Sequence, residues 1–330
     1  MEEKRKNYTP LDGGKLYAYA LLTSLVLSFV VSLILMGVAS ATGDDASVLS
    51  QNMGFQFCYS AILYIVLFTV FLLFNRKNNI DFPKATKLNT KPNMKTLVVC
   101  LMLGLVFVLL VSPFINCYTW AVQTIGIKSP ADIELTSAWE FVVALFVTAL
   151  LPAVVEEIFY RGVILNGLKR LGKWTAILIS AAAFSLMHGN LYQLPYTFGL
   201  GVLLGYIAFE TGSLLPTILI HFLSNAQVLI FSFFKIGGDA PLTMSWAYFG
   251  IAMAFLALAA VIVALALFFI KKFNKNKDET TFVPQTEPDG TIIEGEIVPQ
   301  AKKNAEKLAA TKLWIIAFTA AVILLVLNLL

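Results

Sequence analysis

Long apolar stretches alternate with short polar segments along most of the chain. A membrane-spanning helix needs about 20 mostly apolar residues, with a range of roughly 17 to 25. Nine stretches satisfy this requirement, at approximately 16–41, 53–74, 96–120, 138–162, 174–190, 192–210, 213–235, 244–270 and 313–330. Strict two-residue alternation is absent from the sequence, so a membrane β-barrel is disfavoured. The pattern predicts an all-α fold, a polytopic transmembrane helix bundle with eight core spans and a C-terminal ninth span.

The composition agrees with a chain surrounded by a lipid bilayer. Hydrophobic residues make up 58% of the chain and charged residues only 13%, whereas a typical soluble domain carries about 25% charged residues. This excludes a soluble globular enzyme, a disordered protein and a nucleic-acid partner. The three cysteines lie inside apolar runs, so we expect free thiols.

Basic residues gather in every second connection and predict the orientation. They occur before the first span, in 75–95, around 169–173 and after 270, whereas the connections 42–52 and 121–137 are acidic or nearly uncharged. The positive-inside rule then places the N-terminus in the cytoplasm. The first apolar run exceeds the 7–15 residues of a cleavable signal peptide, so we expect an uncleaved anchor. The short loops suggest an integral protein of a bacterial plasma membrane.

The predicted organisation has three parts. Residues 1–270 form the eight-span membrane domain, and residues 313–330 form a C-terminal transmembrane anchor. Between them, 271–312 is polar and contains several prolines and glycines, which predicts a flexible cytoplasmic linker. Within this linker, 291–298 could form a weak hairpin, and 301–312 has a helical pattern that leads into the last span.

A few polar side chains fall inside the predicted spans, where ionisable groups are costly and usually functional. They are Glu156, Glu157, Arg161, His188, His221 and Asn225. Glu157 and Arg161 are four residues apart and can pair on one helix face. Glu156 is turned by about 100° from Glu157, so we expect it to face the bundle interior. The alternative is that both glutamates lie near the cytoplasmic headgroups.

The two histidines show the same four-residue spacing. Phe184 shares a helix face with His188, and His221 shares one with Asn225. Taken alone, His188 could be a core histidine with a backbone partner, and the second pair could be a hydrogen bond between helices. With a rise of about 1.5 Å per residue, however, all of these groups lie between the inner leaflet and the region of the midplane. They can therefore meet in one layer.

Such a layer is suited to peptide hydrolysis. Glu156 can act as a general base, with His188 orienting the water. His221 and Asn225 can donate hydrogen bonds to a developing oxyanion. A zinc version would use Glu156, His188 and His221 as ligands, with water in the fourth position. The HExxH spacing is absent, so we favour a mechanism without a cofactor and keep zinc as the alternative.

The three motifs resemble the CPBP family, which includes CAAX prenyl endopeptidases and the Abi proteins of bacteriocin processing or immunity. The motifs are Glu156-Glu157-x-x-x-Arg161, then Phe184-x-x-x-His188, then His221-x-x-x-Asn225, within about 137–228. The resemblance implies an eight-helix protease core. It implies Glu156, His188, His221 and Asn225 as catalytic residues, with Glu157, Arg161 and Phe184 in support.

These observations predict an intramembrane endopeptidase that acts on a membrane-associated peptide or protein. A bacterial peptide or bacteriocin leader is our preferred substrate, and a prenylated tail stays open. A non-catalytic membrane scaffold or bacteriocin-immunity protein, binding a partner through the same polar cavity, is the alternative. Repeated halves with matching broken helices are not visible in the sequence, which disfavours a transporter.

Overall fold

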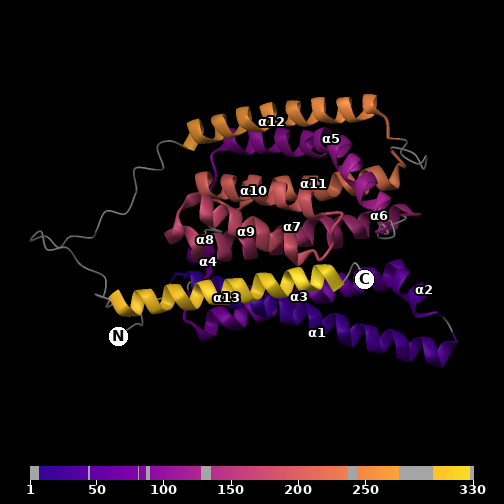
Figure 1. Ribbon diagram of the computed structural model, residues 1–330, viewed down its shortest axis with the longest axis horizontal. Helices are drawn as coiled ribbons and strands as arrows, with labels where there is room; N and C mark the ends of the chain where they lie inside the picture. The colour runs from indigo at the N-terminus through magenta and orange to yellow at the C-terminus, as the bar shows by residue number, and fades with distance from the viewer. Residues whose placement is uncertain are drawn as a thin grey trace, which may run out of the picture.

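The computed structural model describes residues 7–43, 45–80, 82–86, 90–127, 135–236, 244–274 and 300–327. Every regular element within these ranges is a helix. Figure 1 shows the long helices lying side by side with their axes roughly aligned. The outer layers are formed by α5 (Met94–Thr124) with α12 (Trp246–Asn274), and by α1 (Pro10–Thr42) with α3 (Met53–Lys77) and α13 (Gln300–Leu327). The helices that carry the polar motifs lie between them.

The fourth predicted span is one irregular helical rod. It consists of α6 (Ala138–Ala144), the π-helical η1 (Leu145–Leu150), α7 (Leu151–Glu157), the π-helical η2 (Ile158–Leu165), α8 (Asn166–Leu168) and the 3₁₀ turn η3 (Lys169–Leu171). Ser137 and Glu140 form a capping box at its start. Pro152 lies in the first turn of α7, where it cannot donate a helical hydrogen bond. The wide turns thus flank the segment that holds both glutamates.

Three further helices complete the middle layer, α9 (Lys173–Met187), α10 (Leu194–Thr211) and α11 (Leu215–Phe233). The contact between α9 and α10 is close at Gly201. A Cβ atom on this glycine would lie 3.0 Å from the Cα and Cβ atoms of Ala181. The missing side chain therefore lets the two backbones approach. Two short helices, α2 (Ala46–Gln51) and α4 (Phe82–Thr86), lie in connections.

The helical membrane bundle predicted from the sequence is confirmed. Seven helices of the described ranges are long and apolar enough to cross a membrane. α9 is apolar but has only 15 residues, and it ends at Met187 rather than at the predicted residue 190. The count of nine spans therefore stays a prediction. The weak hairpin predicted for 291–298 lies outside the described residues, and the predicted helix 301–312 is present as the first part of α13.

The C-terminal helix α13 packs against α1, although their contacting residues are about 300 positions apart in the sequence. Trp314 stacks on Tyr17 with ring centroids 5.6 Å apart, and its indole N–H donates to the Pro10 carbonyl at 3.1 Å. One face of α13 is buried, at Ala310, Trp314, Ala317, Ala321 and Leu325. These positions recur at intervals of three or four residues, as expected for a helix packed along one stripe. α13 is thus an integral part of the bundle.

Candidate active site

A fully buried ion pair joins α7 to η2. The Arg161 Nη1 atom lies 2.6 Å from Oε1 of Glu157, and neither side chain is exposed. The Nη2 group of Arg161 donates to the Gly201 carbonyl at 3.2 Å, and its guanidinium lies over the Phe184 ring at 4.6 Å. Hydrogen bonds and a cation–π contact reduce the cost of burying these charges. The pairing predicted from the four-residue spacing is confirmed.

His221, on α11, lies between the two glutamates. Its Nδ1 atom is 3.0 Å from Oε1 of Glu157, and its Nε2 atom is 3.8 Å from Oε2 of Glu156. The imidazole is almost completely buried. Because the only available role for Nδ1 beside a carboxylate is that of a donor, Glu157 fixes the ring with a proton on Nδ1. The Nε2 atom is then directed toward Glu156.

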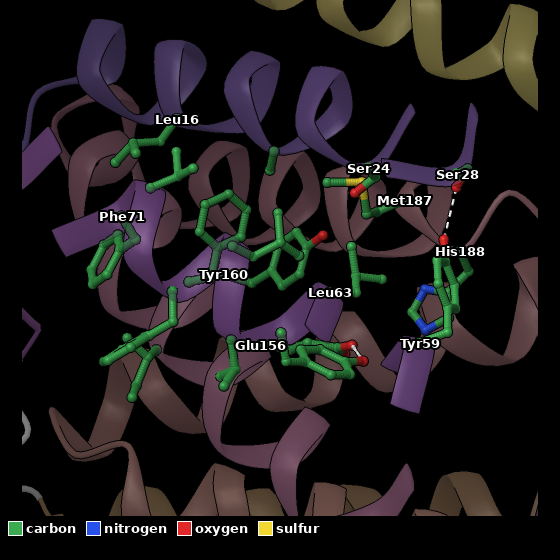
Figure 2. Close-up of a pocket in the computed structure, with 18 residues that line it drawn as sticks. Leu16, Ser24, Ser28, Tyr59, Leu63, Phe71, Glu156, Tyr160, Met187 and His188 are labelled. Atoms are coloured by element: carbon green, nitrogen blue, oxygen red, sulfur yellow. Dashed lines mark hydrogen bonds between the residues drawn. The ribbon is translucent and has the colours of Figure 1, made fainter. Parts of the chain in front are cut away.

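Glu156 faces a different part of the structure from Glu157. Its side chain is 17% exposed and lines a cavity of about 330 Å³ formed by α1, α3, the α7–η2 segment and the end of α9. Figure 2 shows Glu156 on one wall of this cavity. The hydroxyl of Tyr64, on α3, donates to Oε1 of Glu156 at 2.6 Å. The two neighbouring glutamates therefore have the separate environments that the helical geometry predicts.

The cavity changes character along its length. Leu16 and Phe71 lie at one end in Figure 2, and Ser28, Tyr59 and His188 lie at the other. The hydroxyls of Ser28 and Tyr59 are 2.7 Å apart and share a hydrogen bond. Apolar side chains thus face one part of a bound molecule, and hydrogen-bonding groups face another part. A peptide with an apolar segment would satisfy both.

His188 lies at the end of α9 and lines the same cavity as Glu156. Its Nδ1 atom is 2.8 Å from the carbonyl oxygen of Phe184, so the backbone partner considered from the sequence is present. With a proton on Nδ1 directed at that carbonyl, Nε2 is left as an acceptor. Phe184 contacts both histidine rings edge-on, with centroids 4.9 Å from His188 and 5.6 Å from His221. Both imidazoles therefore pack against the same aromatic ring.

Asn225 is the predicted site residue that the structure does not bring into contact with the others. It is half-buried on α11, one turn beyond His221. Among the hydrogen bonds of the described residues, none involves its amide. Its role in catalysis therefore stays a prediction.

Tyr64, Tyr59 and Ser28 were not identified from the sequence. All three precede the motif region and lie on α1 or α3. A usable signal was present, because a tyrosine hydroxyl inside an apolar stretch needs a hydrogen-bond partner when it is buried. That signal does not identify the partner, and only the packing of α3 against α7 brings Tyr64 to Glu156.

The donor positions do not form a three-ligand metal site in this conformation. Within the described ranges, no three histidine, cysteine, aspartate or glutamate side chains are grouped closely enough to hold a metal ion. Of the zinc set considered from the sequence, His221 directs Nδ1 to Glu157 and His188 directs Nδ1 to a backbone carbonyl, so Nε2 is the nitrogen of each ring that would bind zinc in that alternative.

Ionisable side chains buried inside a membrane helix bundle usually mark a functional site. Residues 138–227 match the family of Rce1-like type II CAAX prenyl endopeptidases. A curated relative, the membrane-embedded CAAX protease MroQ of Staphylococcus aureus (strain USA300), is 25% identical over 178 residues, which cover 52% of this chain and 71% of the relative. No solved structure gives a significant match.

Together these matches support a CPBP family protease and confirm the resemblance drawn from the three motifs. The matched segment contains all three motifs. Neither match mentions a bacteriocin, so that part of the prediction has no further support.

Proposed function

We propose that this protein is an intramembrane endopeptidase that uses Glu156 to activate water. The observation that carries the proposal is the position of the Glu156 carboxylate. It lines a cavity shared with His188, and its Oε2 atom lies 3.8 Å from the His221 imidazole. A carboxylate that can be reached from a cavity, with histidines beside it, has the geometry that general-base catalysis requires.

In the proposed reaction, Oε2 of Glu156 takes a proton from a water molecule. The water oxygen attacks the carbonyl carbon of the scissile peptide bond. Meanwhile the Nε2 atom of His188 accepts a hydrogen bond from the second O–H of the water and so orients the lone pair of its oxygen toward that carbon. The tetrahedral intermediate collapses, the carbon–nitrogen bond breaks, and Glu156 returns its proton to the leaving amine. This sequence needs no external oxidant, reductant or co-reactant.

His221 and Asn225 would stabilise the oxyanion of that intermediate. His221 can donate from Nε2 only if both ring nitrogens carry protons, because the Nδ1 proton is directed at Glu157.

The proposed substrate is a membrane-associated peptide or protein reached from the bilayer. Its apolar part would contact the Leu16 and Phe71 end of the cavity, and its backbone would contact the Ser28, Tyr59 and His188 end. The matched family and the relative are both named for CAAX proteolysis, so prenylated and unmodified peptides should both be tested.

The test compares purified wild type with Glu156→Gln in cleaving a membrane-delivered peptide library. Glu140→Gln is the matched control, because it makes the same substitution at the start of the same span. Glutamine also preserves the capping box with Ser137. We expect Glu156→Gln to lose cleavage and Glu140→Gln to retain it. Equal cleavage by wild type and Glu156→Gln would contradict the proposal and favour the scaffold alternative.

A further inference from the structure

We propose that Tyr64 is a positioning residue for the Glu156 carboxylate. This inference rests on the proposed function of Glu156. Tyr64 lies in the middle of α3, well before residues 138–227, where the family match is found. The proposed active site would therefore include α3, a helix from outside the matched segment.

The two oxygens of the Glu156 carboxylate have different environments. Oε1 accepts the Tyr64 hydroxyl at 2.6 Å, and a hydrogen bond of this length to a charged acceptor is among the stronger kinds. Oε2 is buried and has no hydrogen-bond partner within the described ranges. It lies 3.8 Å from Nε2 of His221, beyond hydrogen-bonding distance. Tyr64 thus holds one oxygen and leaves the other able to receive a proton.

Without this hydroxyl, the Glu156 carboxylate could adopt a second arrangement. Rotation of the glutamate side chain by a small angle would bring it into direct contact with His221, since the present gap is less than 1 Å longer than a hydrogen bond. Such a contact would use Oε2 and leave it unable to receive a proton from water. The hydrogen bond from Tyr64 to Oε1 opposes this movement.

Tyr8 provides a matched control outside the cavity. It is a buried tyrosine whose hydroxyl donates to Oδ1 of Asn75, on α3, at 2.7 Å. Neither Tyr8 nor Asn75 is among the residues that line the cavity. Loss of a buried tyrosine hydroxyl can therefore be separated from loss of the hydroxyl that contacts Glu156.

A positioning role predicts a specific kinetic effect. Removal of the Tyr64 hydroxyl leaves the cavity and its charges in place, so substrate binding should change little. Displacement of a catalytic group by about 1 Å can reduce a rate about 100-fold. We therefore expect Tyr64→Phe to lower kcat by roughly 10- to 100-fold, with KM within about twofold of wild type.

The experiment measures kcat and KM of the full-length protein in lipid nanodiscs for wild type, Tyr64→Phe, Tyr8→Phe and Glu156→Gln. The inference predicts a loss of kcat for Tyr64→Phe that Tyr8→Phe does not share. If Glu156→Gln is inactive while the two tyrosine variants behave alike, the inference fails and the proposed function stands. If Glu156→Gln remains fully active, the proposed function fails, and the inference fails with it.

A second pair of variants separates positioning from packing. It also tests the inference if Tyr64→Phe does not fold. Replacement of Tyr64 by p-aminophenylalanine keeps the ring and a para donor, whereas p-methylphenylalanine keeps the same shape without a donor. We expect the amino variant to recover much of the kcat that the methyl variant loses. Equal kcat values for the two would overturn the inference, because packing alone would then account for the effect.

Discussion

Glu157 and His221 are joined inside the bundle, with Nδ1 of the histidine 3.0 Å from Oε1 of the glutamate. The same carboxylate oxygen accepts Arg161 at 2.6 Å. Glu157 thus orients the imidazole through one contact and is stabilised by the guanidinium through the other. This arrangement gives the two adjacent glutamates different expected effects on stability and catalysis.

Removal of Arg161 should destabilise the protein strongly. In Arg161→Met, the buried Glu157 loses the charge that balances it, and breaking a buried ion pair costs about 3–5 kcal/mol. We expect a drop of that size in the free energy of unfolding in detergent. Arg170→Met, at an exposed arginine nearby, should change it by about 0.5 kcal/mol or less. Similar losses of unfolding free energy in the two variants would show that the buried ion pair stabilises the protein no more than an exposed arginine does.

Substitution of the two glutamates should separate activity from stability. Glu156→Gln keeps an oxygen that accepts from Tyr64 and affects a side chain with access to the cavity, so we expect lost cleavage with less than about 1 kcal/mol of destabilisation. Glu157→Gln removes the charge opposite Arg161 and should cost several kcal/mol. Thermal unfolding and peptide cleavage measured on the same samples check this. The reverse pattern would contradict our assignment of the two residues.

Gly201 should tolerate no added side chain. A Cβ atom there would lie 3.0 Å from the backbone of Ala181, and overpacking of this kind costs about 1–3 kcal/mol. Gly199, on the same helix, has open space at its Cβ position. Gly199→Ala should therefore be neutral, or stabilising by up to about 1 kcal/mol through helix propensity. Equal melting temperatures for Gly199→Ala and Gly201→Ala would show that α9 and α10 can separate without cost.

Truncation of Trp314 should loosen the C-terminal helix. Trp314→Ala removes a buried ring and its hydrogen bond to Pro10, a loss of about 3 kcal/mol. Ile315→Ala changes a side chain that is 61% exposed on the same helix and should have little effect. Cleavage by an added protease before α13, followed by size-exclusion chromatography, would report release of the helix. Retention of α13 in Trp314→Ala would contradict its docking through this residue.

Activity should survive metal chelation. The described donor groups do not form a three-ligand cluster. We expect cleavage by purified protein to be unchanged after dialysis against a strong chelator. Loss of activity that returns on addition of zinc would instead support the zinc alternative with Glu156, His188 and His221.

The features predicted best from the sequence are those that depend on residue spacing within one helix. The four-residue interval between Glu157 and Arg161 predicts their ion pair, and the 100° turn between Glu156 and Glu157 predicts their separate environments. Apolar run length locates most of the long helices to within about six residues at each end, although the fourth rod continues to Leu171 rather than ending at the predicted residue 162. These relationships depend on the geometry of a single helix, which a sequence carries directly.

Relationships between distant helices were not predictable in the same way. Tyr64 and Glu156 are 92 residues apart, and no spacing rule connects them. The π-helical turns of η1 and η2 were also missed, because wide turns have no composition signal of the kind that marks a helix cap. The extent of α9 was overestimated because His188, Gly189 and Asn190 were counted in the span. Gly189 adopts a left-handed conformation, with φ at 57°, just after the helix ends at Met187.

The packing of Trp314 against the first turns of α1 has a consequence for biosynthesis. α1 leaves the ribosome well before α13, so the surface around Gly13, Gly14 and Tyr17 stays uncovered until α13 has been made. In this interval, lipid or an insertion factor must cover that surface. A chain interrupted before α13 would present the same uncovered surface, which gives membrane quality control a feature by which to distinguish incomplete chains from complete ones.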